Sequence, residues 1–472
     1  MKSRTRIFAR RGAAWLLACL VAACGVGQDG TGAAPDTQAT GVVTGFGSVI
    51  VDGVHFDLSG ADIATDGTSG RTQADLRVGM VVTVSGTLSA NATGGSATKV
   101  VYESLLRGTI DSAADTTGFY VFGRRIDIDS TTLFEGVGSA AELQPGAPLQ
   151  VSGFYRGEGF RATWVRLEAS AVTPQLTGFI AARNGSVVRV AGLNVDISSA
   201  TLEGGAALNT LAVGQRVRVV LQAPPSGGAA IATRLVLLSE GLAGPLRRLL
   251  LHSLVSQWDP QARTFLLNRQ SVRLDPAAQF VDGDLADIGD GARVGVVGTR
   301  GSDAVLVAER VQVYRPAIDG YLRGVIASVD LPARRFSVEV APGVQVQVQP
   351  RTLLSDLTLA GGGLTLDNLA VGNKVLALGW VNAGRIDAGL VQRLPILTPG
   401  SGIGGRITNV SGSTFQILGT LVTTNNAQFF DAQGQAQNQA EFFAALQANP
   451  VVRAEGLLLG NSLTAATVRA VP

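Results

Sequence analysis

Residues 76–86 read LRVGMVVTVSG, and this stretch decides the fold because its elements return along the 472-residue chain. Apolar residues stand at every second position from Val82 to Val84, a period of two that is typical of half-buried strands. Gly79 precedes the strand, where a tight turn needs a left-handed backbone. The same pattern returns at four later glycines and, in the last copy, at an asparagine that tolerates the same backbone: Gly146, Gly214, Gly291, Gly372 and Asn449.

Two further patterns recur in the same order. A glycine followed two residues later by Val or Ile opens the copies, with serine in the fourth place: Gly41, Gly108, Gly178, Ser253, Gly324 and Gly405. Successive starts are 67, 70, 75, 71 and 81 residues apart. An alanine, followed by Thr in all but the fourth copy, closes them at Ala97, Ala162, Ala232, Ala308 and Ala466, and the fifth copy is degenerate near Leu390. Three patterns in one order indicate six tandem repeats.

Each copy predicts a small β-barrel. About five strands alternate apolar and polar residues, as in Val344–Val348, and Gly-rich turns separate them. A short helix is expected between the third and fourth strands, most clearly at residues 438–447 (NQAEFFAALQ). This order is that of an OB-like barrel, although an SH3-like barrel or a small split barrel fits the same pattern. The fold class is therefore all-β, with six tandem OB-like modules.

The repeats set the expected domain organisation. Residues 1–23 are expected to be a signal peptide and residues 24–40 a flexible tether. The modules are expected at residues 41–104, 106–172, 176–240, 249–316, 318–395 and 401–472.

The N-terminus indicates export. Five basic residues precede an apolar run of about twelve residues from Gly12 to Ala23, which is too short to span a membrane and is typical of a secretory signal. Leu20-Val21-Ala22-Ala23-Cys24 resembles a bacterial lipobox, which implies that Cys24 becomes the lipidated first residue. Gly25, in place of Asp, implies the outer membrane. The expected location is the bacterial outer membrane, lipid-anchored, with the modules facing the periplasm or the surface.

Composition excludes several classes of protein. The chain has 60 glycines, 46% hydrophobic residues and only 16% charged residues, which argues against both long helices and disorder. Its 38 Lys and Arg against 36 Asp and Glu give +2. Without the five basic residues of the signal peptide the balance is 33 against 36, or −3. Aromatic residues are sparse and basic residues are interleaved with acids, so no nucleic-acid partner is expected.

The first copy resembles a known family. Its characteristic segments are Gly45–Val49, Asp52–Phe56, Leu76–Gly79 and the Val82-x-Val84-x-Gly86 run. They are similar to the bacterial domain-of-unknown-function family 5666, well in the first copy, fairly in the second, third and fifth, and weakly in the fourth and sixth. Members of that family are exported or lipid-anchored proteins with tandem copies. The resemblance implies no activity and transfers no catalytic residue.

Few residues indicate chemistry. The two histidines, His55 and His252, lie in different copies and are expected to be packed or surface residues. Together with the absence of cysteine after Cys24, they make a His or Cys metal site improbable. A cluster of four aspartates is a weak calcium candidate, since Asp-Gly turns explain it equally well: Asp282, Asp284, Asp287 and Asp290. No nucleophile elbow or phosphate loop is present, so we expect no catalytic site and no cofactor.

The leading hypothesis is a non-catalytic, lipid-anchored envelope protein whose modules form an extended rod and act as a structural or interaction scaffold. Its partners would be the membrane, through the anchor, and an envelope protein or glycan. The alternative is an envelope polysaccharide- or oligosaccharide-binding lipoprotein. That alternative uses three tryptophans as possible sugar platforms, Trp164, Trp258 and Trp380, although packing in the core or rim also explains them.

Overall fold

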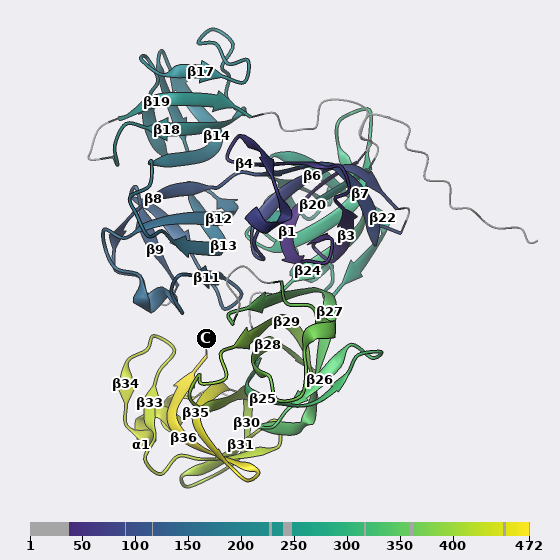
Figure 1. The fold of residues 1–472 in the computed structure, drawn as a ribbon, viewed down its shortest axis with the longest axis vertical. Helices are drawn as coiled ribbons and strands as arrows, with labels where there is room; N and C mark the ends of the chain where they lie inside the picture. The colour runs from purple at the N-terminus through teal and green to yellow at the C-terminus, as the bar shows by residue number, and fades with distance from the viewer. Residues whose placement is uncertain are drawn as a thin grey trace, which may run out of the picture. The chain divides into compact units, whose positions relative to one another are not determined.

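Six groups of strands, which we call units 1 to 6 in chain order, make up the computed structural model (Figure 1). The structure describes residues 37–89, 91–115, 117–225, 229–238, 248–315, 318–358, 363–446 and 450–471. The predicted signal peptide, Cys24 and the tether up to residue 36 therefore lie outside the described residues, as does Asn449.

The strands form three sheets of twelve, each containing two units. Units 1 and 4 share β1 (Thr37–Gly45), β2 (Val49–Val51), β3 (Val54–Asp57), β4 (Asp62–Thr65), β5 (Thr68–Arg71), β6 (Val81–Leu88) and β7 (Gly94–Tyr102) with β20 (Arg248–Asp259), β21 (Thr264–Leu267), β22 (Gln270–Val281), β23 (Arg293–Arg300) and β24 (Leu306–Tyr314). Units 2 and 3 share β8 (Leu106–Ser112), β9 (Gly118–Val121), β10 (Arg124–Asp127), β11 (Leu133–Glu135), β12 (Pro148–Arg156) and β13 (Gly159–Leu167) with β14 (Gln175–Asn184), β15 (Val187–Val190), β16 (Leu193–Asp196), β17 (Thr201–Glu203), β18 (Arg216–Leu221) and β19 (Ala230–Leu237). Units 5 and 6 share β25 (Gly320–Asp330), β26 (Arg335–Val338), β27 (Ala341–Asp356), β28 (Lys374–Asn382) and β29 (Arg385–Leu394) with β30 (Ser401–Ser411), β31 (Thr414–Ile417), β32 (Thr420–Thr423), β33 (Gln428–Phe430), β34 (Ala436–Gln437), β35 (Val451–Leu459) and β36 (Ser462–Ala470).

Within each unit five strands close a ring. In unit 1 the order is β1-β2-β3-β7-β6 and back to β1, with β3 and β7 parallel and the other neighbours antiparallel. The same ring closes in unit 2 through β8, β9, β10, β13 and β12, and in the remaining four units with the same parallel pair. The all-β prediction is therefore confirmed, and ring closure gives each of the five ring strands a partner on both sides within its unit.

The predicted helical segment is present but mostly shorter than an α-helix. It follows the third ring strand as a 3₁₀ turn in four units: η1 (Gln73–Asp75), η2 (Ala140–Glu142), η3 (Leu285–Asp287) and η4 (Leu366–Asn368). In unit 6 it is the α-helix α1 (Gln439–Ala445), shorter at both ends than the predicted residues 438–447. Asn438 caps it by accepting a hydrogen bond from the Glu441 N–H at 2.8 Å.

Backbone hydrogen bonds join the turn glycine of the first recurring pattern to the strand that the second pattern opens. The Gly79 N–H donates to the Val43 carbonyl at 2.8 Å, and the Val43 N–H donates to the Met80 carbonyl at 2.8 Å. Gly79 has φ +93°, a conformation that glycine adopts without steric cost. The equivalent bond from turn glycine to first strand recurs in units 2 to 5, from Gly146 to Ile110, Gly214 to Ile180, Gly291 to Val255 and Gly372 to Ile326.

The glycine that opens each copy leaves room for the second strand. A Cβ on Gly41 would lie 1.9 Å from Asp52 Oδ2, and one on Gly108 would lie 2.5 Å from Phe122 Cζ. Ser253, which holds this place in unit 4, instead donates its hydroxyl to Asn268 Oδ1 at 2.7 Å. The recurring glycine is thus explained by the close approach of the neighbouring strand and turn rather than by ligand chemistry.

The closing alanine lies opposite a β-bulge. A Cβ on Gly86 would lie 1.9 Å from the Ser96 carbonyl oxygen, where the pairing of β6 with β7 shifts register. The buried partner at this shift is an alanine in all six units: Ala97, Ala162, Ala232, Ala308, Ala388 and Ala465. The sequence pattern was therefore misplaced in two copies. Ala388 fills the fifth place, and Ala465 rather than Ala466 fills the sixth, because the bulge leaves space only for a small side chain.

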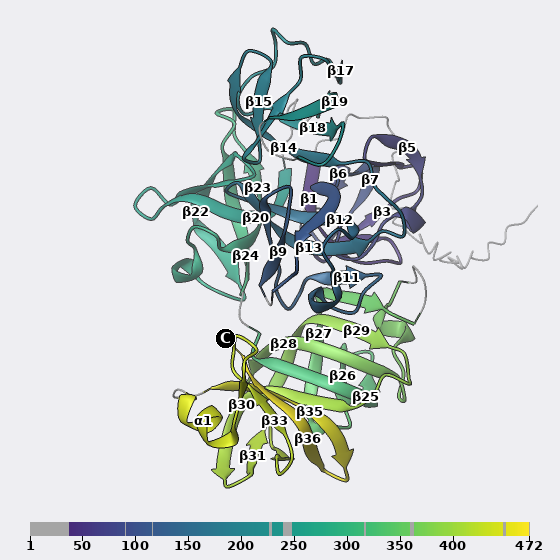
Figure 2. The ribbon, with the colours of Figure 1, turned by 90° about the vertical axis from the view of Figure 1, so that its left-hand side faces the viewer.

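Unit 1 shares its sheet with unit 4. Residues Thr37–Thr40 of β1 run parallel to Arg248–Leu251 of β20 on one side and antiparallel to β6 on the other (Figures 1 and 2). Thr37, Gln38 and Ala39 are buried, so the predicted tether does not extend to residue 40. In the predicted extended rod, units 1 and 4 would not pair with each other. That part of the prediction is wrong.

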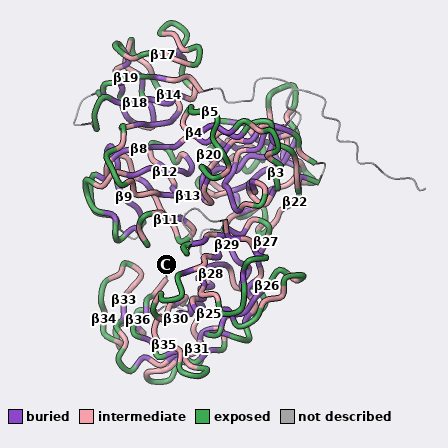
Figure 3. Tube along the Cα trace, in the orientation of Figure 1, coloured by how far each residue is buried: buried purple, intermediate pink, exposed green. Residues whose placement is uncertain are grey.

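The cores follow the sheets. Buried positions run along the strands and exposed ones gather at the connections (Figure 3). One apolar cluster spans units 5 and 6, a second spans units 2 and 3, and a third belongs to unit 4. The cluster of unit 1 also takes in side chains of units 2, 4 and 5, such as Leu133, Leu250 and Leu353. In the part of the chain that the structure describes, no helix is long and apolar enough to cross a membrane.

Candidate functional site

A cavity of about 330 Å³ lies where units 1, 2, 4 and 5 meet, and we call it the junction cavity. Its wall combines apolar side chains such as Leu254 and Leu353 with charged groups from every one of the four units. Its volume lies within the range of small-molecule sites, which bind through an apolar wall and a few placed polar groups.

Three polar residues, linked by hydrogen bonds, lie at the wall of the junction cavity. Asp52 lies in the turn between β2 and β3, His252 in β20, and Arg293 begins β23. Asp52 Oδ1 lies 2.6 Å from His252 Nδ1, and the Arg293 Nε–H donates to His252 Nε2 at 2.8 Å. Because Arg293 is always a donor, Nε2 must accept and Nδ1 must carry the proton. His252 is therefore a neutral imidazole that donates to Asp52.

Aromatic rings enclose the imidazole. The ring of Tyr314, at the end of β24, stacks on His252 with centroids 4.2 Å apart and an 8° angle between planes. Phe154 of unit 2 packs on the ring at 4.8 Å. The Arg293 guanidinium lies over Tyr314 at 4.9 Å and over Phe154 at 5.5 Å. The Tyr314 hydroxyl also donates to Asp52 Oδ1 at 3.3 Å. The cluster thus joins three units through one desolvated charge network.

Burial governs the protonation of this cluster. It lowers the pKa of His252, and the Arg293 charge adds to this effect, while Asp52 opposes it. Burial also raises the pKa of the Tyr314 hydroxyl well above its ordinary range, with Asp52 contributing. Burial alone would raise the pKa of Asp129, but the charges of Arg161 and Arg293 outweigh it and hold the pKa below its usual value.

The geometry restricts what His252 can do. Its side chain has 0% exposure and both ring nitrogens are engaged, so neither can take a proton from a bound molecule without breaking the network. Asp52 Oδ2 and the indole Nε1 of Trp380 are buried without a hydrogen-bond partner, and both residues line the junction cavity. The arrangement suits holding units together and presenting a pocket, rather than general acid–base chemistry.

The three predicted tryptophans have different surroundings. Trp380 of β28 lines the junction cavity and also a neighbouring cavity of about 260 Å³. Gly389 stands beside its ring, where a Cβ would lie 3.1 Å from the indole. Trp258 is half-buried and packs edge-on against Phe265 at 5.9 Å. Trp164 is only 2% exposed and packs between units 1 and 2, so it offers no face to a sugar. Its role as a platform is therefore corrected to interface packing.

The four aspartates of the calcium candidate do not converge. Asp284 accepts from the Ala286 N–H at 2.8 Å and Asp287 from the Asp284 N–H at 2.9 Å, which caps η3. Asp290 accepts from the Trp258 N–H at 2.9 Å, and Asp282 pairs with Arg351. Among the described residues no group of three or more carboxylate, His or Cys side chains is placed to hold an ion. The aspartates are turn and capping residues, in line with the alternative reading of this loop.

The sequence did not predict that the residues of this cluster come together. Asp52, His252, Arg293 and Tyr314 come from distant parts of the chain and share no motif. One signal was present, since His252 interrupts the apolar run from Leu249 to Leu254 at a place where a polar side chain must find a partner. The lipidation residue Cys24 lies outside the described residues, so it stays a prediction.

The fold and the cluster define an all-β repeat protein whose closed five-stranded units are joined by buried polar side chains. The chain belongs to the family described as Domain of unknown function (DUF5666), whose model matches residues 107–166, 177–235, 254–312 and 404–469, just over half of the chain. The matches fall on units 2, 3, 4 and 6 and not on units 1 and 5, so the predicted order of resemblance, strongest in the first copy and weakest in the fourth and sixth, is not confirmed. No curated protein matches the chain.

Proposed function

We propose that the chain is a non-catalytic, lipid-anchored protein of the bacterial cell envelope, whose six OB-like modules act as a structural and interaction scaffold. The ring order, with a parallel third and fifth strand and a helical turn between the third and fourth, supports the OB-like assignment over an SH3-like barrel. The lipobox ending at Cys24 supports the anchor and the outer membrane.

One observation favours a scaffold most, namely that buried polar and charged side chains are paired across the contacts between units. Arg218 of unit 3 pairs with Glu103, which follows β7 of unit 1, and their side chains are only 4% and 8% exposed. The Asp52–His252–Arg293 chain joins units 1 and 4 through buried hydrogen bonds to a neutral imidazole. Buried pairs of this kind fix one arrangement, because an alternative arrangement would leave a charge desolvated and unpaired.

The anchor is tested by substitution of its one cysteine. We expect Cys24→Ser to abolish incorporation of labelled palmitate and to move the chain from the membrane to the soluble fraction, with Cys19→Ser as the matched control. Unchanged labelling of the Cys24→Ser chain would contradict the anchor. Crosslinking of the wild-type chain in its native envelope, compared with Cys24→Ser, would then identify partners that depend on anchoring.

A second candidate is binding of an envelope saccharide, which the position of Trp380 favours. Its indole lies at two adjoining cavities with an unpartnered N–H, and aromatic rings with a nearby polar group are suited to sugar rings. We expect envelope glycans to change tryptophan fluorescence in the wild-type chain and in Trp258→Phe, but not in Trp380→Phe. An identical response of Trp380→Phe would exclude this residue as the platform.

A further inference from the structure

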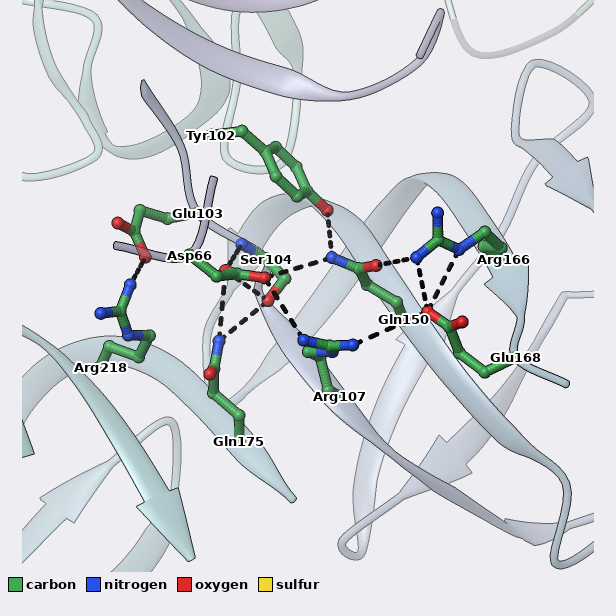
Figure 4. A network of polar contacts seen from close by, with 10 residues as sticks. All are labelled: Asp66, Tyr102, Glu103, Ser104, Arg107, Gln150, Arg166, Glu168, Gln175 and Arg218. Atoms are coloured by element: carbon green, nitrogen blue, oxygen red, sulfur yellow. Dashed lines mark hydrogen bonds and ion pairs between the residues drawn. The ribbon is translucent and has the colours of Figure 1, made fainter. Parts of the chain in front are cut away.

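A second cavity, of about 420 Å³, lies between units 1, 2 and 3 and shares no lining residue with the junction cavity. We call it the polar cavity. Figure 4 shows the network at its wall, in which side chains of unit 1 and of the segment after it meet others from β8, β12, β13 and β14. Four arginines but only two aspartates line it, so the lining carries an excess of positive charge.

The two lining carboxylates are already satisfied. Asp66 Oδ1 accepts from the Ser104 N–H at 2.8 Å, the Ser104 hydroxyl at 2.9 Å and the Gln175 amide at 3.2 Å. Its Oδ2 accepts from the Gln150 amide at 3.3 Å (Figure 4). Asp75 accepts from the backbone N–H and hydroxyl of Thr72 at 2.8 and 3.1 Å. These acids need no cation from a ligand.

Three of the four guanidinium groups are not satisfied. Arg71 is 3.9 Å from Asp75, Arg107 is 3.9 Å from both Asp66 and Glu168, and Arg234 is 3.7 Å from Glu203. These distances exceed hydrogen-bond length, and none of the three donates a hydrogen bond to another described residue. Their side chains are 43%, 31% and 46% exposed, so a ligand can reach them. Each guanidinium therefore keeps planar, bidentate donors for an oxyanion.

The fourth arginine is fixed. Arg166 donates to Glu168 at 2.7 Å and to the Gln150 amide oxygen at 3.0 Å, which orients that amide toward Asp66 (Figure 4). Glu168 and Glu203 do not line the cavity, although each makes an ion pair with an arginine that does. The remaining wall includes Thr65 and Thr68, whose hydroxyls suit a ligand rich in hydroxyl groups, and Tyr102, whose buried hydroxyl accepts from the Gln150 amide at 3.3 Å.

We propose that the polar cavity binds an acidic sugar, a hydroxyl-rich ring that carries one phosphate or carboxylate group. The oxyanion would be held by Arg71, Arg107 and Arg234, and the ring hydroxyls by the threonines of the wall. The cavity volume lies in the range of small-ligand sites. This proposal does not depend on the scaffold function or on Trp380, because it rests on a different cavity.

Isothermal titration of the full chain with glucose 6-phosphate, glucuronate, glucose and inorganic phosphate tests the proposal. We expect both acidic sugars to bind and glucose to bind at least about tenfold more weakly, since it lacks the charge-assisted hydrogen bonds. Inorganic phosphate should bind more weakly than glucose 6-phosphate. Equal binding of phosphate would overturn the sugar component, and no binding of either acidic sugar at millimolar concentration would overturn the site.

Two variants locate the binding. Arg107→Met and Arg234→Met keep the length of the side chain and remove the guanidinium, and each should weaken glucose 6-phosphate binding about tenfold. Arg385→Met is the matched control, because Arg385 is 48% exposed on unit 5 and pairs with Asp387 outside this cavity. The half-exposed position of Arg234 keeps that variant folded, which circular dichroism checks. Unchanged binding in Arg107→Met and Arg234→Met would overturn the assignment of these residues.

Discussion

Lowering the pH should weaken the contact between units 1 and 4 through His252. Its pKa lies below the ordinary value of 6.5 because of burial, with Arg293 adding to the effect against the attraction of Asp52. As the pH falls below 6.5, His252 becomes protonated in the unfolded chain while it stays neutral in the folded chain. The stabilisation from the neutral imidazole is therefore fully present above pH 6.5 and is lost as the pH falls toward the lower pKa of the folded state.

The size of the effect follows from this linkage. Protonation of folded His252 would place an N–H at Nε2, directly facing the Arg293 Nε–H at 2.8 Å. If the folded state excludes the proton, the free energy of unfolding falls by at most about 1.4 kcal/mol per pH unit below 6.5. Between pH 7.5 and 5.5 this amounts to about 1.4 kcal/mol in total.

The assay compares urea unfolding at pH 7.5, 6.5 and 5.5 by circular dichroism in the wild type, His252→Gln and His55→Gln. Glutamine keeps a donor and an acceptor but does not titrate, so His252→Gln should be less stable at pH 7.5 and should lose the histidine contribution to the pH dependence. His55 is exposed, and among the described residues its ring bonds Ser48 alone, at 3.2 Å, so His55→Gln should follow the wild type. Glu103, whose pKa burial raises, is present in all three proteins. Identical pH dependence in the wild type and His252→Gln would refute the reasoning.

Two further substitutions test a buried ion pair between units and a β-bulge within a unit. Glu103→Gln leaves Arg218 buried beside a neutral group, and we expect a loss of about 3–5 kcal/mol in unfolding free energy, most of it recovered in the double variant Glu103→Met/Arg218→Met. Equal stability of the single and double variants in thermal unfolding would show that the pair is not desolvated. Gly298→Ala places a Cβ 2.0 Å from the Val307 carbonyl oxygen and should cost about 1–3 kcal/mol, whereas Gly289→Ala, with nothing within 4 Å, should be close to neutral. Matching melting temperatures for these two variants would argue against the bulge as the reason for this glycine.

The repeats and the closed units could be read from the sequence because local rules determine them. Gly79 needs a left-handed backbone and bonds Val43, so both positions must recur wherever the same turn meets the same strand. The bulge glycine and its alanine follow the same logic. Where the local pattern was degenerate, as near Leu390, the bulge itself identified Ala388 as the equivalent residue.

The association of the units could not be read in this way. Thr37–Thr40 resemble a tether in sequence, yet strands pair with them on both sides and Thr37, Gln38 and Ala39 are buried. The His252 cluster assembles from residues some 200 positions apart, and no spacing rule connects Asp52 with Arg293. Trp380 was found by residue type alone, while Trp164 follows the packing alternative, because its ring faces a neighbouring unit.

The pairing of β1 with β20 also has a consequence for the order of assembly. Thr37 meets Arg248, so more than two hundred residues of chain must be in place before this edge is covered. Units 2 and 3 pair as immediate neighbours, through β8 and β14, and can complete their shared sheet during that interval. Until unit 4 arrives, the first four residues of β1 present an open edge to any other chain. We therefore expect slow maturation limited by this long-range contact, and a chain truncated before unit 4 should be prone to edge-to-edge association.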